Sequence, residues 1–147
     1  MKMQISENAI SIIQKLEGFR SKPYLDLGGK PTIGYGHTGG VTMLTNPISE
    51  QTATQYLLDD LNFFEEQVNR FVKVPINQNQ FDALVLLIFN VGVTPLLKRL
   101  GKYLNSGDYN QAAEEFLQWD HVGVKVVQGL LNRRMQEREL FNKPVEA

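Results

Sequence analysis

The chain has 147 residues, of which 42% are apolar, and this suffices for one compact domain or for two small lobes that share a helix. Its net charge of −1 and the lack of a strongly basic region argue against nucleic acid as a partner. Cysteine is absent, which excludes disulfides and thiolate metal sites, and the longest apolar run, residues 83–89, falls far short of the about 20 residues that a membrane-spanning helix needs.

The N-terminal third predicts a helix followed by a small antiparallel sheet. Apolar residues recur at helical spacing between Ile5 and Leu16, with Ser6 as the N-cap and Gly18 at the end of the helix. Glycines and prolines then separate three short segments that favour strands, at 24–25, 32–35 and 41–43. Because a sheet of this size is marginally stable alone, we expect it to pack on a helix.

A long helix is predicted next. Ser49 is its N-cap, and an apolar stripe follows one face from Ala53 to Phe71. Pro75 stops the helix, because proline lacks the backbone N–H that a helix interior requires. A helix of more than about 20 residues spans roughly 30 Å, a length suited to a strut between two lobes.

The C-terminal half predicts a helical lobe. Asn77 and Gln80 match a capping box that opens the most apolar segment, residues 81–89. The remaining elements are a helix over about 95–104, a helix opened by Asp108 with an apolar stripe over 112–119, a loop at 120–128 and a last helix at 129–141. The predicted fold class is α+β in one domain, with a β-containing lobe and N-terminal helix at 1–48, a linking helix at 49–72 and a helical lobe at 73–147.

Three polar residues of the N-terminal third form the main catalytic hypothesis. Glu17 ends an apolar helix, where partial burial is expected to raise its pKa, as a general acid requires. Asp26 in the hairpin turn and Thr32 on the next strand are placed to hold one water between them. Taken singly, each has an ordinary explanation: a surface glutamate, a turn aspartate and a β-branched strand residue. Together they supply the acid and the carboxylate that glycoside hydrolysis requires.

The histidines and the glycine-rich motif do not indicate a further catalytic, metal or dinucleotide site. His37 follows the strand, where a histidine is more often a structural hydrogen-bonding residue than a catalyst. With His121 as the only other histidine, neither metal-ligand spacing nor a Ser-His-Asp arrangement arises. Residues 34–39 match G-x-G-x-x-G, but no helix opens inside the motif, so we reject a dinucleotide site.

Four residues of the C-terminal half are candidates to line a cleft, namely Asn90, Trp119, Arg133 and Arg134. Their structural alternatives are a helix C-cap for Asn90, a core anchor for Trp119 and solvated helix charges for the two arginines.

The order of the catalytic candidates is typical of a known family. Glu17, Asp26 and Thr32 satisfy the signature E-x8-D-x5-T, and the blocks EGFR, TIGYGHT, VPINQNQFDALV, FNVG and GLLNRRMQERELF accompany it. Over about residues 6–143 the chain resembles the lysozymes of tailed bacteriophages, glycoside hydrolase family 24, also called endolysins or muramidases.

The resemblance implies a lysozyme-like fold with a cleft between the lobes. It also implies hydrolysis of the β-1,4 bond between N-acetylmuramic acid and N-acetylglucosamine in bacterial peptidoglycan, with inversion, which causes cell lysis. By carry-over, Glu17 is the general acid, while Asp26 and Thr32 position and activate the water. Inversion calls for carboxyl groups roughly 6.5–9.5 Å apart.

The resemblance implies further residues around this site. Tyr35, Asn90 and Arg134 are expected to bind substrate. Arg134 best matches a basic residue that approaches the catalytic glutamate, with Arg133 as the alternative and as a structural residue near the site. His37 is expected to form a structural ion pair with one of the acids of the long helix.

The chain departs from the family in two places. Residues 92–100 are shorter than the usual stretch and lack its Ser-Thr pair, so the helix there is expected to start differently, and Val124 stands where a second glycine is common. Two alternatives therefore stay open. One is a non-catalytic peptidoglycan-binding module. The other is a lytic transglycosylase, which Asp26 and Thr32 argue against because it needs no water.

We expect no metal and no organic cofactor, because two carboxyl groups suffice for the reaction. The expected partners are glycan strands of peptidoglycan, with a monomeric protein and no insertion into a membrane. The N-terminus has no apolar h-region and thus predicts no signal peptide, so the protein is expected in the host cytoplasm before its release to the cell wall.

Overall fold

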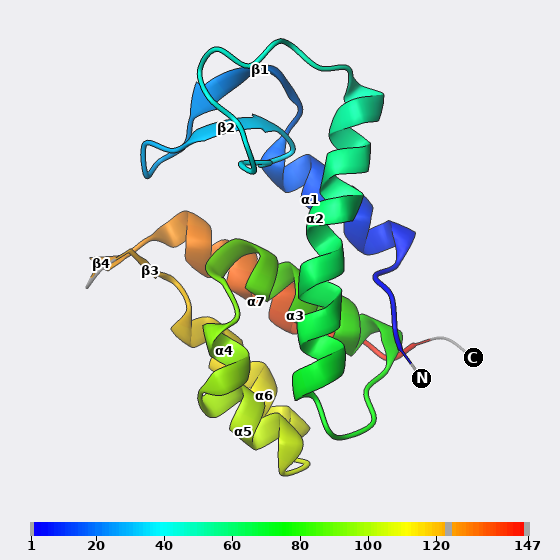
Figure 1. Ribbon diagram of the computed structural model, residues 1–147. Helices are drawn as coiled ribbons and strands as arrows, with labels where there is room; N and C mark the ends of the chain where they lie inside the picture. The colour runs from blue at the N-terminus through cyan, green and yellow to red at the C-terminus, as the bar shows by residue number, and fades with distance from the viewer. Residues whose placement is uncertain (1, 123–124, 146–147) are drawn as a thin grey trace. The chain divides into compact units, whose positions relative to one another are not determined.

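The computed structural model describes residues 2–122 and 125–145 and confirms the mostly helical α+β architecture (Figure 1). Its elements, in chain order, are α1 (Glu7–Glu17), β1 (Arg20–Leu25), β2 (Pro31–Gly34), α2 (Glu50–Phe71), α3 (Gln78–Val91), α4 (Thr94–Leu97), α5 (Arg99–Asn105), α6 (Tyr109–Glu115), a 3-10 turn (Phe116–Gln118), β3 (His121–Val122), β4 (Lys125–Val126) and α7 (Gln128–Asn142). None of the described helices is long and apolar enough to cross a membrane.

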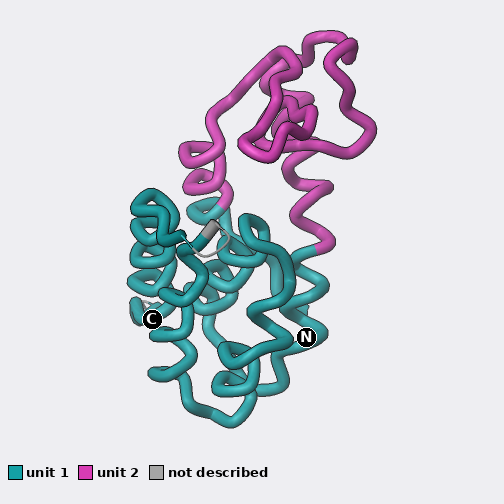
Figure 2. The backbone as a smooth tube through the Cα atoms, turned by 90° about the vertical axis from the view of Figure 1, so that its left-hand side faces the viewer, with its two compact units in different colours: residues 1–9, 64–147 teal, residues 10–63 magenta. Residues whose placement is uncertain are grey.

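The chain divides into two compact units, which Figure 2 shows in different colours. Unit 1 comprises residues 1–9 and 64–147, and unit 2 comprises residues 10–63. Both boundaries fall inside helices, one in α1 and one in α2, so each of these helices contributes residues to both units.

The sheet of unit 2 is a single antiparallel hairpin. β1 pairs with β2 in a register that sets Tyr24 opposite Thr32. The third strand predicted at 41–43 is wrong. The Thr45 hydroxyl accepts the backbone N–H of Thr42, the Thr42 hydroxyl accepts that of Leu44, and the segment closes into a turn. Threonine side chains thus satisfy backbone donors that a third strand would have paired.

The two helices that reach unit 2 begin and end where their local signals predict. The Ser6 hydroxyl accepts the N–H of Ala9, and the Ser49 hydroxyl accepts the N–H of Thr52. The backbone N–H of Gly18 closes the last turn of α1 on the carbonyl of Gln14. Within unit 2, the predicted stripe of α2 is buried at Ala53, Leu57 and Leu61.

Unit 1 is built around α3. The predicted capping box is present, since Asn77 accepts the N–H of Gln80 and the Gln80 side chain accepts the N–H of Asn77. Every residue from Phe81 to Ile88 is buried, and α3 packs against α7. Asp82 lies in this buried stretch and is satisfied by the N–H and hydroxyl of Ser6, at 3.0 and 2.5 Å. The burial of α3 on all sides matches its nearly continuous apolar sequence.

The single helix predicted over about 95–104 is wrong, because the structure has two short helices there. Lys98, between α4 and α5, takes extended backbone angles of φ −111° and ψ −151°. The break brings the carbonyl of Leu96 against Gly101, where a Cβ atom would lie only 1.9 Å from the oxygen. The close approach of these two backbones is possible only with glycine at position 101.

Replacing Gly101 with alanine should lower the free energy of unfolding by about 2 kcal/mol or more, because backbone atoms must move to admit the new methyl group. Gly129, in α7, is the matched control, since a Cβ atom built there meets nothing within 4 Å. Gly129→Ala should leave stability unchanged or raise it slightly. Denaturant unfolding measures both variants, and equal stability of the two would contradict this account of the break.

The segment predicted as a loop at 120–128 contains a short hairpin instead. β3 pairs with β4, with His121 opposite Val126, and the N–H of Val127 donates to the carbonyl of Asp120. Strands of two residues leave little periodic pattern in a sequence, which is why the prediction missed them. Val124, where the chain departs from the family, lies outside the described residues. The last predicted helix, at 129–141, is confirmed as α7.

Candidate active site

Glu17 is the last residue of α1, and its carboxyl group is half-buried in unit 2. It lies against the turn that follows β2, because a Cβ atom at Gly36 would be 3.4 Å from the Cδ of Glu17. Gly36 has a φ of 78°, in the left-handed region that glycine adopts without strain. The backbone of this turn thus lies next to the carboxyl group, and a side chain at position 36 would contact it.

Asp26 lies in the turn between β1 and β2, with its carboxyl group exposed. Its Oδ1 accepts the backbone N–H of Gly28 at 2.9 Å and that of Lys30 at 2.8 Å. Its Oδ2 makes no hydrogen bond to a residue that the structure describes. One oxygen is therefore used to hold the turn, and the other faces solvent and is free to accept from a water.

Thr32 lies in β2 and is only 2% exposed. Its hydroxyl donates to the carbonyl of Lys30 at 2.8 Å. Asp26 binds the N–H of Lys30, so both side chains are oriented by the backbone of this one residue. The sequence analysis did not single out Lys30, because its role depends on backbone N–H and carbonyl groups, which nearly every residue type has.

Tyr24 is a second residue that the sequence analysis missed. Burial raises the pKa of its phenol, and the charge of Glu17 raises this pKa further. Arg20, whose guanidinium lies 4.3 Å from the ring centre, lowers it, and Asp26 raises it. The sequence analysis placed Tyr24 only in a segment that favours a strand, and its register opposite Thr32 comes from the structure.

Tyr35 and His37 serve the packing of unit 2. Tyr35 is 5% exposed, and its hydroxyl donates to Glu50 Oε2 at 2.8 Å, which together with burial raises the pKa of the phenol. It thus offers little surface to the substrate that it was predicted to bind. His37 Nδ1 lies 2.8 Å from Asp60 Oδ2, so Asp60 is the helix acid that the sequence left unidentified. The His37 ring also stacks on Tyr56 with centres 4.6 Å apart.

The candidates of unit 1 meet in a buried network. Arg134 is 0% exposed, unlike the solvated charge or substrate-binding residue that the sequence suggested. Its guanidinium binds Glu137, donates to Asn90 Oδ1 at 2.9 Å and donates to the carbonyl of Trp119 at 3.2 Å. Asn90 lies in the last turn of α3, whose C-cap is Gly92. Arg133, by contrast, is half-buried, with no hydrogen-bond partner for its Nε among the described residues.

Glu137 carries the largest pKa shift to which the structure gives a value. Burial raises the pKa of its carboxyl from 4.5 to about 7, although the adjacent Arg134 favours the charged form and opposes the shift. Burial also lowers the pKa of Arg134. Nothing in the residue pattern marked Glu137, because a glutamate in a polar helix is usually a solvated surface charge.

The stability of the protein should therefore carry a pH dependence that Glu137→Gln removes. Between pH 4.5 and about 7 the folded state holds a proton that the unfolded state has released, so the free energy of unfolding falls as pH rises through this window. The difference in unfolding free energy, wild type minus variant, should fall by on the order of 3 kcal/mol between pH 4 and pH 8. Urea unfolding across this range measures it. If the unfolding free energies of the wild type and the variant changed with pH in parallel, Glu137 would not be the source of this pH dependence.

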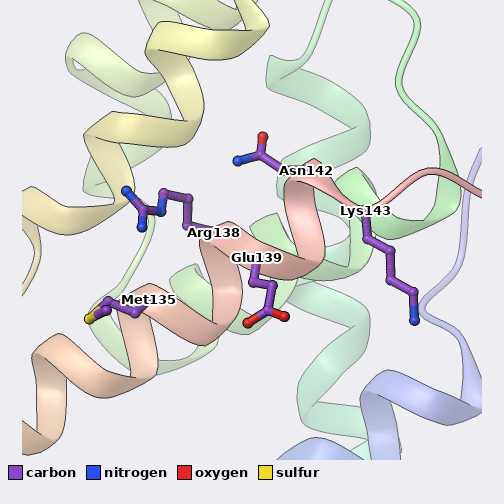
Figure 3. Close-up of a pocket in the computed structure, with 5 residues that line it drawn as sticks. All are labelled: Met135, Arg138, Glu139, Asn142 and Lys143. Atoms are coloured by element: carbon purple, nitrogen blue, oxygen red, sulfur yellow. The ribbon is translucent and has the colours of Figure 1, made fainter.

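An open depression of about 690 Å³ on α7 does not resemble an active site. It is lined by Met135, Arg138, Glu139, Asn142 and Lys143. Figure 3 shows these side chains pointing in different directions, so no polar groups converge on one ligand atom. Nor do the described residues contain a cluster of three or more His, Cys, Asp or Glu side chains that could hold a metal ion.

Comparison with known proteins gives consistent matches. A family model described as "Phage lysozyme" matches residues 14–137. The endolysin of Bacillus phage B103 is 44% identical over 142 residues, which cover 95% of this chain and 54% of that protein. The endolysin of Salmonella phage P22 is 42% identical over 144 residues, covering 95% of this chain and 98% of that protein.

Solved structures agree with these relatives. An endolysin from Escherichia coli O157:H7 phage FAHEc1 superposes with a TM-score of 0.89 at 36% identity, over 100% of this chain and 98% of that chain. The predicted fold class is thereby confirmed. The chain spans about half the length of the first Bacillus phage relatives, 54% and 55%.

Proposed function

Because this chain belongs to the phage lysozyme family, we propose that it hydrolyses the β-1,4 bond between N-acetylmuramic acid and N-acetylglucosamine in peptidoglycan, with inversion at the anomeric carbon. The observation that carries the proposal is the arrangement of one hairpin in unit 2. Asp26 and Thr32 are both held by the backbone of Lys30, and Glu17 lies against the turn that follows the same hairpin.

In the proposed reaction, Glu17 is the general acid. It donates its proton to the glycosidic oxygen as the bond from that oxygen to the anomeric carbon breaks. The turn at Gly36 lies against the Glu17 carboxyl and helps to fix its position.

Asp26 and Thr32 handle the attacking water. The Oδ2 of Asp26 accepts a proton from the water as the water oxygen bonds to the anomeric carbon on the face opposite the leaving group. The Thr32 hydroxyl, whose proton is held by Lys30, offers its oxygen as an acceptor that orients the water. Both carboxyl groups return to their starting state by proton exchange with solvent, so no cofactor takes part.

The remaining contacts and the setting of the reaction belong to the same proposal. Asn90 of unit 1 binds the glycan strand, as the family resemblance implies. The protein acts as a monomer on peptidoglycan, is held in the host cytoplasm until it is released to the cell wall, and causes lysis.

Analysis of the products tests the proposal. Purified wall fragments should gain new reducing ends, each product should carry the mass of one added water, and the fresh anomer should be inverted. Products that lack the water and contain an anhydro ring would make the protein a lytic transglycosylase. Binding to the fragments without new reducing ends would make it a non-catalytic binding module.

A further inference from the structure

The buried side of α7 holds a charged network that the proposed acid and base do not use. Arg134 and Glu137, one helical turn apart, are 0% and 3% exposed. Nη2 of Arg134 donates to Oε2 of Glu137 at 2.9 Å, and Nε lies 2.7 Å from Oε1 as an ion-pair contact without hydrogen-bond geometry. The same Nη2 donates to Oδ1 of Asn90 on α3, at 2.9 Å.

We propose that Glu137 is a positioning residue, which acts through Arg134 to fix the side-chain amide of Asn90 so that Asn90 presents Nδ2 to the glycan. The chemical partner of Nδ2 is an acceptor oxygen, and the strongest neutral acceptor on these sugars is the carbonyl of the N-acetyl group. The inference rests on the proposed function, and in particular on a glycan contact at Asn90.

The orientation of the Asn90 amide follows from the chemistry of its neighbour. A guanidinium has donors and no acceptors, so the amide atom facing Arg134 must be the oxygen. A flipped amide would set two donors against each other. With Oδ1 used in this way, Nδ2 is the atom left for a ligand. It makes no hydrogen bond to any other residue within 2–122 and 125–145, and Asn90 is only half-buried.

Glu137 determines where the guanidinium lies. One charge-assisted hydrogen bond from Nη2 and the ion-pair contact at Nε hold the same edge of the guanidinium against one carboxylate, so the Nη2 that also reaches Asn90 is kept in place. The carbonyl of Trp119 accepts from Nη1 at 3.2 Å and holds the other side. A buried ion pair contributes little stability beyond what an apolar pair of similar size would give. We therefore assign the ion pair a role in orienting the side chain of Asn90, and not a role in stabilising the fold.

The first test exchanges the donor for an acceptor with the fold retained. In Asn90→Asp one carboxylate oxygen still accepts from Arg134, while the other faces the glycan in place of Nδ2. At about pH 8, the KM for soluble glycan strands should rise about tenfold, the effect of one lost hydrogen bond, with kcat changed less than about twofold. An unchanged KM would overturn the proposal, because it would show that no donor is needed at this position.

The second test asks whether Glu137 acts through Asn90. At about pH 8, where the Glu137 carboxyl is charged, Glu137→Gln keeps the size of the side chain and removes the charge that orients Arg134, so KM should rise about fivefold or more. In an Asn90→Ala background the same substitution should no longer change KM, since the amide that it orients is gone. If Glu137→Gln raises KM equally in both backgrounds, Glu137 acts by another route and the proposal is wrong.

An exposed ion pair between α7 and α6 supplies the matched control. Arg138, labelled in Figure 3, lies 3.1 Å from Glu114 Oε2. Glu114→Gln should leave KM and kcat unchanged, because surface pairs of this kind contribute little. A KM shift equal to that of Glu137→Gln would show a general effect of removing a carboxylate that pairs with an α7 arginine, which would also overturn the proposal.

A binding measurement separates this inference from the proposed function. Chitotetraose, a soluble oligomer of N-acetylglucosamine, is titrated into the 15N-labelled protein, and the Nδ2 side-chain resonance of Asn90 is followed. A ligand-dependent shift that weakens in Glu137→Gln supports the positioning role even if no hydrolysis is found. Normal hydrolysis by a wild-type protein whose Asn90 resonance does not move upholds the function and rejects the inference.

Discussion

Glu17→Gln should lower the turnover of peptidoglycan by about a thousandfold or more, while the protein stays folded. Glutamine has nearly the size of glutamate, so the contact with the turn at Gly36 is kept. It cannot give a proton to the glycosidic oxygen, and general acid catalysis alone is worth about a hundredfold to ten-thousandfold. Release of reducing ends measures turnover, and thermal unfolding with circular dichroism checks the fold.

Glu7→Gln is the control for this experiment, because Glu7 is an exposed carboxylate in the first turn of the same helix. It should retain nearly full turnover. If Glu17→Gln retains turnover within a few-fold of wild type, Glu17 is not the acid and the proposed mechanism fails.

Asp26→Asn should lower turnover at least about a hundredfold without opening the hairpin turn. The asparagine Oδ1 can accept the same two hydrogen bonds, from the backbone N–H groups of Gly28 and Lys30, that the aspartate accepts. The group that faces solvent becomes a neutral amide, which does not take a proton from water. The initial rate of reducing-end release measures the loss, and the KM should change little.

The matched control for this substitution is Asp108→Asn. Asp108 also accepts a backbone N–H, from Gln111 at 3.1 Å, and asparagine caps a helix as well as aspartate does. Turnover should be unaffected there. Equal losses in the two variants would point to stability, and wild-type turnover in Asp26→Asn would remove Asp26 from the mechanism.

Local signals predicted most of the secondary structure. Four caps were read correctly, at Ser6, Ser49, Asn77 and Asp108. Each of these hydrogen bonds joins residues three apart, so the sequence contains both partners within one turn of helix. The break after α4 was missed because the packing of the Leu96 carbonyl on Gly101 overrides such signals, whereas the error at 41–43 came from local threonine hydrogen bonds that compete with a strand.

Some features of the candidate site were also predicted from local signals, and others were missed. The positions of Glu17 and Asp26 followed from the motif and from the ends of predicted elements. The partner of His37 did not, because Asp60 is 23 residues away and equivalent acids lie nearby on the helix. Burial of Arg134 was also missed, since an arginine in a polar helix reads as a surface charge.

The sequence by itself determined the family, the fold class and the identities of the proposed acid and base, because these depend on local periodicity and on residues in a fixed order. Only the tertiary structure decided how Asn90 is oriented and that Glu137 is buried with Arg134. Asn90 and Arg134 are 44 residues apart, and they meet because α3 packs against α7. The pKa of Glu137 follows from the water that this packing removes, and no property of residue type or spacing records that loss.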